Sequence, residues 1–518
     1  MPSLSRLRST LPLLTTLLPL PAQDPVHYRL RIVDATDKVA EVTATFPTAG
    51  KATLELFLPR WSPGFYRVED YHRHVLTLTA KEGERAIPCT QPQPGRWHLA
   101  TGGAERITVS WTLRCNTASV TGNQIAKDFA VFCGPATFLG EVAAPSRPHI
   151  VQVDLPDGWR NVATGLPENP GEPANDWLAR DYDWLVDSPF VLGTIATTAF
   201  DVLGARHEWA QFGDAGTWTG DAIAPTLQKI AGELCATFGD VPFSRYVFLA
   251  GFRQANGGLE HLDSTLLSVS RRQEPSDASF LSFVAHEYAH AFNVKRLRPV
   301  ELGPFDYEHP PATDGLWIAE GLTTWFGDLA LVRSGVVDKA AWLRLVSSHI
   351  ATLQRTPGRR MQSLADASRS VWNGTTSGVG GDPRKTISYY VKGPVVGLVL
   401  EARLRVATAG RAGLDELIRQ AYARYSGERG FTHAEFEALA TAIAGADQTP
   451  FFDRAVRGTE ELDYGEALAW FGLQFPTADE DAPKDGRWRL EVAPTATAEQ
   501  QQHLATLLAP TPPPSRRK

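Results

Sequence analysis

The sequence predicts a multidomain α+β protein with an all-β N-terminal domain, a mixed α/β domain and a helical C-terminal domain. The chain has 518 residues, whereas a single hydrophobic core stops growing near about 250–300 residues. Alternating apolar and polar runs fill the first 200 positions, which is typical of strands, and later the apolar spacing becomes helical. We therefore predict domains at 24–200, 201–335 and 336–475.

The all-β prediction for 24–200 depends on alternation, which is clear in Tyr28 to Ile32 and in Ala52 to Phe57. Successive side chains of a strand point to opposite faces, so each run places its apolar residues on one face. Pro, Gly and Asp residues separate the runs at the spacing of an antiparallel sandwich.

The region 201–335 combines a strand with helices. Tyr246 to Ala250 is a short apolar run of the kind that forms a buried strand, and it lies between helical patterns. The predicted helices cover Asp221 to Phe238, Asp277 to Lys295 and Gly315 to Arg333. This arrangement is typical of a mixed α/β unit.

The region 336–475 is predicted to be almost wholly helical. The helix over Thr432 to Ala444 begins with a capping box formed by Thr432 and Glu435. The segment Asn373 to Gly381, rich in Gly, Ser and Thr, is either a lid over a site or a long surface loop. The other predicted helices cover Asp338 to Gln354, Ser388 to Ala407 and Gly413 to Ser426.

The two ends of the chain differ from the rest in composition. Residues 1–22 carry Arg6 and Arg8, an apolar run from Leu11 to Leu20 and a small residue at Ala22. This order is typical of a secretory signal peptide and predicts export, periplasmic or secreted; a disordered leader on a cytoplasmic protein is the alternative. Residues 476–518, rich in Asp, Glu, Pro and Ala, are predicted to be a disordered tail.

Charge and hydropathy exclude several classes of partner. A net charge of −7 and a pI near 6.0 give no basic field for nucleic acid. No later apolar run approaches the roughly 20 residues of a transmembrane helix. The four cysteines lack the CxxC spacing of a thiolate zinc site, and sequence leaves any disulfide among them open; they are Cys89, Cys115, Cys133 and Cys235.

An HExxH motif, His286-Glu287-Tyr288-Ala289-His290, lies inside a predicted helix. Residues four apart share one helix face, so both imidazoles can hold one metal ion, and Glu287 can act as general base toward a metal-activated water. The apolar run Phe280 to Ala285 predicts that this helix is buried. Under the alternative, capping or core-packing histidines, the buried imidazoles would need other partners.

Glu320 completes the predicted metal site. A catalytic zinc takes three protein ligands and keeps a fourth position open. Glu320 interrupts an apolar helix downstream of the motif, as the third ligand of glutamate-type zinc peptidases does; a solvated helix charge is the alternative. We predict one Zn²⁺ per chain, held by His286, His290 and Glu320.

Further motifs are spread along most of the chain. They are Pro63-Gly64-Phe65-Tyr66, Asp187-Ser188-Pro189, Gly257-Gly258-Leu259-Glu260-His261, His286 to Pro299, Leu316 to Gly321, Tyr389 to Gly393, Phe452-Asp453-Arg454 and Gly458 to Tyr464. Together these motifs resemble the glycyl aminopeptidase family of zinc peptidases. The resemblance runs from about His27 to Phe475 and implies a β-rich domain, a thermolysin-like catalytic domain, a helical domain and usually a C-terminal PDZ domain. Only about forty residues follow Phe475, about half of what a PDZ fold requires.

The resemblance implies two further functional positions. Tyr390, in a Tyr-x-Lys-Gly pattern, would stabilise the oxyanion; a packed core aromatic is the alternative. Glu260 would bind the free α-amino group of a peptide, while Gly257 and Gly258 let the strand approach the substrate; a surface acid is the alternative. The implied activity is aminopeptidase action on peptides with N-terminal Gly or Ala. An endopeptidase or a non-catalytic peptide-binding homologue remain alternatives.

Four other residues are weaker candidates. Asn293 and Asp328 are expected as partners of the ligating imidazoles, because metal-bound histidines usually donate their other ring nitrogen. Arg296 and Arg298 would either bind a peptide carboxylate or form a solvated helix end.

Overall fold

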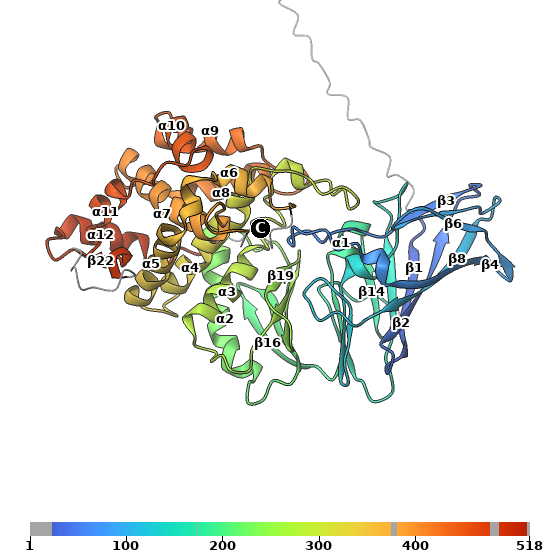
Figure 1. Cartoon of the computed structure of the whole chain (residues 1–518). Coiled ribbons are helices and arrows are strands. Elements are labelled where there is room, and N and C mark those ends of the chain that lie inside the picture. The colour runs from blue at the N-terminus through green and yellow to red at the C-terminus, as the bar shows by residue number, and fades with distance from the viewer. Residues whose placement is uncertain (1–22, 172–173, 374–380, 477–485, 515–518) are drawn as a thin grey trace, which may run out of the picture.

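The computed structural model describes residues 23–171, 174–373, 381–476 and 486–514. Figure 1 shows the N-terminal strands in blue on one side, a green sheet in the middle and yellow-to-red helices on the other side. This arrangement confirms the predicted multidomain α+β class. The predicted signal peptide, 1–22, and residues 374–380 of the Asn373 to Gly381 segment lie outside the described residues.

The N-terminal region is built on a seven-stranded sheet in the order β14-β12-β1-β2-β8-β4-β5. β1 alternates as predicted: Val26, Tyr28 and Leu30 are buried and the residues between them are exposed. The neighbours are antiparallel except for β1 and β12, which are parallel. The strands are β1 (Val26–Asp34), β2 (Val39–Pro47), β4 (Val75–Glu82), β5 (Arg85–Ala86), β8 (Arg106–Arg114), β12 (His149–Asp154) and β14 (Asp176–Ala179).

Two four-stranded sheets complete this region, and α1 (Tyr182–Val186) precedes β15. One sheet has the order β11-β3-β7-β6: β11 (Gly140–Glu141), β3 (Leu54–Phe57), β7 (Arg96–Leu99) and β6 (Cys89–Gln93). The other has the order β13-β15-β10-β9: β13 (Asn161–Ala163), β15 (Phe190–Gly193), β10 (Phe129–Phe132) and β9 (Gln124–Ile125). The four cysteines of the chain are free thiols.

A five-stranded mixed sheet joins the two halves of the molecule. β18 is buried along nearly its whole length because each face of the sheet meets a different hydrophobic core. Phe248 packs with the helices, whereas Val247 and Leu249 pack with the N-terminal strands. The order is β16 (Ala196–Val202), β17 (Ala205–Gly213), β18 (Arg245–Phe252), β20 (Ser264–Ser268) and β19 (Gly258–Glu260), which is an edge strand.

Helices cover the face of this sheet that is turned away from the N-terminal strands, and they extend into the C-terminal half. One continuous hydrophobic core runs from the sheet through these helices. In the described ranges, no helix is long and apolar enough to cross a membrane. The helices are α2 (Gly220–Phe238), α3 (Ala278–Ala289), the π-helix η4 (Trp317–Leu322), α4 (Thr323–Arg333), α5 (Lys339–Arg355), α6 (Leu364–Arg369), α7 (Tyr389–Ala407), α8 (Leu414–Tyr425), α9 (His433–Ala444), α10 (Thr449–Phe452) and α11 (Gly465–Phe471).

The prediction of a disordered tail over 476–518 is wrong for residues 486–514. This segment forms a strand, β22 (Glu491–Val492), that pairs with β21 (Leu473–Gln474), and a helix, α12 (Ala498–Leu507). Thr497 and Gln500 form a capping box at its start, and Leu504 and Leu507 are buried in the helical core. These local signals outweigh the polar, Pro-rich composition.

Candidate metal centre and active site

The HExxH motif lies at the C-terminal end of α3. The helix was expected to continue to Lys295, but it ends at Ala289 with His290 as its C-cap. The chain then turns, and the backbone carbonyl of Asn293 comes within 2.7 Å of His290 Nδ1. The early end of the helix therefore supplies a hydrogen-bond acceptor for the second histidine.

Glycines bring the neighbouring helices close to α3. A Cβ on Gly327 of α4 would lie only 3.0 Å from the backbone nitrogen of His286. A Cβ on Gly321 of η4 would lie 2.6 Å from the Cα of Gly393 on α7. Only glycine permits two backbones to approach so closely. These crossings place Glu320 beside both histidines and the ring of Tyr390 near that of His286.

Three side chains that could hold a metal ion converge at this point. The Nε2 atoms of His286 and His290 are 2.9 Å apart, and Glu320 Oε2 lies 3.5 Å from the first and 3.2 Å from the second. One ligand atom from each residue lies within 4.8 Å of the others. Glu320 and His290 are each 1% exposed, so the protein shields these two side chains from bulk water.

The outer hydrogen bonds orient both imidazoles. His290 Nδ1 donates to the Asn293 carbonyl. Thr324 Oγ1 donates to the Glu320 carbonyl and therefore accepts from His286 Nδ1 at 3.1 Å. Both Nε2 atoms then direct lone pairs toward each other and toward a carboxylate. This donor set fits a divalent cation such as zinc, because lone pairs facing one another are repulsive without a positive charge between them.

The electrostatics of the cluster also favour positive charge. Burial alone would lower the pKa of His290, but the carboxylates of Glu320 and Glu260 raise that pKa to about 10. Burial would raise the pKa of Glu320, but His290 and His286 outweigh it, so the pKa of Glu320 falls well below its usual range. A cation at this position is therefore strongly stabilised.

Glu287, the second residue of the motif, points toward β19. Its side chain is buried, and a Cβ on Gly258 would lie 2.5 Å from its Cδ atom. Burial raises the pKa of Glu287 to about 8; His290 opposes this shift, and the charges of Glu260 and Glu320 add to it. A carboxyl group that titrates near neutral pH can both accept and return a proton.

Glu260 ends β19 and is 3% exposed, so it is not the surface acid of the alternative interpretation. Burial raises the pKa of Glu260, and its Oε1 atom has no hydrogen-bond partner among the described residues. Gly257, directly before β19, has φ +81°, and no atom lies within 4 Å of a Cβ built on it. The edge strand β19 therefore begins next to open space at Gly257 and ends at the buried carboxyl group of Glu260.

Tyr390 lies in the first turn of α7, where Ser388 caps the helix. Its ring centroid is 5.7 Å from that of His286 and 4.9 Å from that of Tyr389. Burial, together with the charge of Glu320, raises the pKa of Tyr390 well above 10. The phenol is therefore protonated and can donate a hydrogen bond.

Comparisons with known proteins agree with this geometry. Residues 27–194 match the Peptidase M61 N-terminal domain, and residues 279–396 match the M61 glycyl aminopeptidase domain. The chain belongs to the M61 glycyl aminopeptidase family. The resemblance predicted from its motifs is confirmed. No curated protein matches this M61 chain.

Solved structures of peptidases share the fold of this M61 chain. An aminopeptidase N family protein from Idiomarina loihiensis superposes with a TM-score of 0.81 at 26% identity, covering 86% of this chain and 78% of that one. An M1 zinc metallopeptidase from Deinococcus radiodurans has a TM-score of 0.57 at 14% identity, covering 85% and 95%. Yeast LTA4 hydrolase in complex with bestatin has a TM-score of 0.53 at 11% identity, covering 85% and 68%.

Two predictions about which side chains hydrogen-bond His286 and His290 need correction. Asp328 accepts hydrogen bonds from Ser282 Oγ and from His349 Nε2 at 3.0 Å, so its carboxylate is used away from the metal histidines. Asn293 acts through its backbone carbonyl, not its side chain. Sequence reasoning missed Thr324, although its position four residues after Glu320 places both on one face of the helix.

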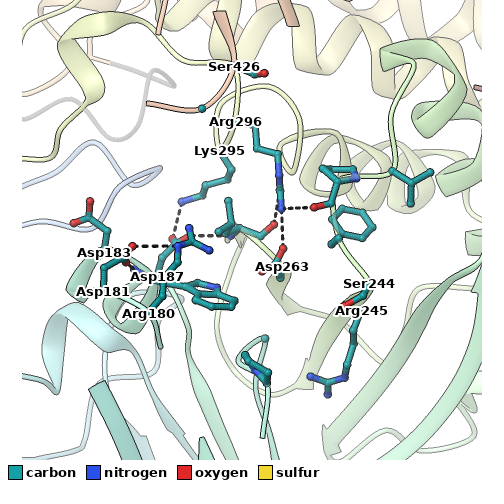
Figure 2. Close-up of a pocket in the computed structure, with 18 of the residues that line it drawn as sticks. Arg180, Asp181, Asp183, Asp187, Ser244, Arg245, Asp263, Lys295, Arg296 and Ser426 are labelled. Carbon is teal, nitrogen blue, oxygen red and sulfur yellow. Dashed lines mark hydrogen bonds and ion pairs between the residues drawn. The ribbon is translucent and has the colours of Figure 1, made fainter. Parts of the chain in front are cut away.

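A separate large cavity is lined by charged side chains, as Figure 2 shows. It holds about 1210 Å³ and is lined by residues from the N-terminal region, the mixed sheet and α8, but not by the three metal-binding side chains. Arg296 and Arg298 line this cavity. Arg296 bonds to Asp263 and Arg298 donates to the Gly427 carbonyl, so neither forms a solvated helix end.

Proposed function

We propose that the protein is a zinc-dependent aminopeptidase that removes Gly or Ala from the N-terminus of peptides. The convergence of His286, His290 and Glu320 beside Glu287 carries this proposal. Membership of the M61 glycyl aminopeptidase family supports the peptidase class.

His286, His290 and Glu320 would hold one zinc ion through Nε2, Nε2 and the carboxylate. When bound, zinc supplies Lewis-acid chemistry, because it polarises a carbonyl group and lowers the pKa of water. Asn293 and Thr324 keep both imidazoles in the tautomer that presents Nε2. The remaining steps depend on the surrounding side chains.

Glu287 would act as the general base. Its carboxylate takes a proton from the water whose oxygen attacks the scissile carbonyl carbon, and it returns that proton to the nitrogen of the leaving amine as the C–N bond breaks. Tyr390 would donate its phenol proton in a hydrogen bond to the oxyanion that forms on attack.

Glu260 would set the exopeptidase specificity. A free ammonium group loses its hydration when it enters a closed site and needs an anion to compensate. Glu260 is a buried acid with an unpartnered oxygen at the end of the edge strand. Gly257 and Gly258 would allow the substrate backbone to lie against that strand.

The test is a panel of Gly and Ala p-nitroanilides and their N-acetyl derivatives, assayed with and without a chelator. We expect hydrolysis of the free-amine substrates only, loss of activity with the chelator and recovery on addition of zinc. Efficient cleavage of acetylated peptides at internal bonds would instead identify an endopeptidase. Turnover that survives chelation and exhaustive dialysis would contradict the zinc mechanism.

A further inference from the structure

A loop of the N-terminal region, Trp61 to Tyr66, reaches the interior of the candidate active site. Its Gly64 has φ +94°, a conformation that L side chains rarely adopt. A Cβ on Gly64 would lie 2.6 Å from Cδ and 2.7 Å from Oε2 of Glu260, and closer still to Oε1. The backbone of Gly64 therefore lies directly against the carboxylate that we assign to the substrate amine.

The loop is held firmly on both sides of Gly64. Trp61 Nε1 donates to the Asp306 carbonyl at 2.9 Å. The rings of Trp61 and Tyr66 pack edge-on against Trp372, with centroids 5.2 and 5.9 Å away. Because Trp61 is 0% and Tyr66 is 1% exposed, moving the loop aside would expose two large aromatic side chains.

The space between this loop and Glu260 is too small for another substrate residue. A single methyl group at position 64 would already overlap the carboxylate, whereas each residue of an extended peptide adds about 3.3 Å of backbone. A peptide whose amine binds Glu260 therefore has no room to continue past Gly64.

We propose that the Trp61–Tyr66 loop, through Gly64, is a steric stop that ends the substrate at its free amine. The site then accepts one residue on the amino side of the scissile bond and releases single amino acids. This inference rests on the aminopeptidase function proposed above. It adds the structural element that limits the substrate to one residue on the amino side of the scissile bond. Gly64 is thus a specificity-determining residue contributed by the N-terminal region.

The first test uses the unmodified, zinc-loaded protein with the peptide Gly-Ala-Ala-Phe and identifies the first products by mass spectrometry. The steric stop predicts free glycine and Ala-Ala-Phe. Gly-Ala and Ala-Phe as first products would overturn the proposal, because they require two residues on the amino side. This measurement needs no variant to fold.

The second test compares Gly64→Ala with Gly158→Ala. Gly158 also has a positive φ, +84°, but no atom lies within 4 Å of a Cβ built on it, so this variant controls for backbone strain. Gly64→Ala should lower kcat/KM for Ala p-nitroanilide about a hundredfold or more, as expected when a buried charge partner is displaced. Gly158→Ala should match the unmodified protein.

Zinc content and the melting temperature of both variants confirm that each is folded and loaded. A folded Gly64→Ala protein with unchanged kcat/KM would overturn the steric stop while leaving the aminopeptidase function in place. An unmodified protein that does not hydrolyse the anilides at all would contradict the proposed function itself. The two failures are therefore distinguishable.

Discussion

Two buried groups of charged residues lie near each other in this molecule, and they differ in how their charges are satisfied. Around the large cavity, carboxylates meet cationic side chains: Asp187 binds Lys295 at 2.7 Å and Asp263 binds Arg296 at 2.8 Å (Figure 2). At the metal centre, atoms of Glu260, Glu287 and Glu320 have no hydrogen-bond partner within the described part of the chain.

This difference supports the proposal that the acids at the metal centre are functional and that the paired charges around the cavity are structural. Buried polar groups are nearly always hydrogen-bonded, so several acids that each have an oxygen atom without a partner, gathered in one place, require an explanation. A metal ion and a substrate ammonium would provide the missing partners. Asp187 and Asp263, which line the large cavity, are already paired with cations, so the size of a cavity alone does not locate the chemistry.

The largest effect is expected at Glu287. Glu287→Gln should reduce kcat between about 10² and 10⁴-fold, because the amide cannot accept the proton of the attacking water. Zinc content should remain unchanged, since Glu287 is not one of the three converging side chains. Steady-state kinetics and metal analysis check this prediction, and a variant with nearly full turnover would remove Glu287 from the role of base.

Tyr390→Phe should lower kcat about 10²- to 10³-fold with little change in KM. The phenol would contact the oxyanion, which exists only near the transition state. A Tyr390→Phe protein whose kcat stays within a few-fold of that of the unmodified protein would make Tyr390 a packing residue.

The paired cavity charges should affect stability and not turnover. Asp263→Asn leaves Arg296 without its anionic partner in a largely buried position and should lower the free energy of unfolding by about 1–3 kcal/mol. The exposed pair of Asp214 and Arg271 is the control, and Asp214→Asn should change stability by less than about 1 kcal/mol. Chemical denaturation measures both. A large loss of kcat in folded Asp263→Asn would place the cavity in the catalytic machinery.

The last effect concerns the pH dependence of stability and His149 in the N-terminal core. Both of its ring nitrogens lack hydrogen-bond partners in the described ranges, and burial lowers the pKa of His149 to about 3. Because protonation favours the unfolded chain, where the pKa is about 6.5, its contribution to stability is complete above pH 6.5 and is lost as the pH falls toward 3.

Replacing His149 with Phe should therefore flatten the pH dependence of stability over this range. The slope should decrease by up to about 1.4 kcal/mol per pH unit. Denaturation curves between pH 7 and pH 4, followed by a probe in the N-terminal region, measure the difference. Identical slopes for both proteins would show that His149 is not held neutral in the folded state.

Local patterns predicted much of this molecule. Alternation along Tyr28 to Ile32 predicted a strand, and the spacing of His286 and His290 predicted two imidazoles on one helix face. The convergence of Glu320 with them was expected from the need of a catalytic zinc for a third ligand and from the position of Glu320 in the apolar helix after the motif, as in glutamate-type zinc peptidases. These features depend on residues that are close in sequence or on the requirements of one ion.

Other features depend on contacts between distant segments, which local patterns do not contain. The Pro63 to Tyr66 motif was noticed in the sequence, but its contact with Glu260 joins positions about 200 residues apart. The early end of α3, which brings the Asn293 carbonyl to His290, likewise follows from tertiary packing. The folded tail was missed because composition was weighed above the capping signal at Thr497.

Zinc content per chain tests most directly whether His286, His290 and Glu320 form a zinc site. The unmodified protein, dialysed after exposure to excess zinc, should retain one equivalent by atomic emission. Glu320→Gln, which keeps the shape of the side chain but removes its charge, should retain far less. An unmodified protein that retains no zinc, or a variant that retains as much, would contradict the account.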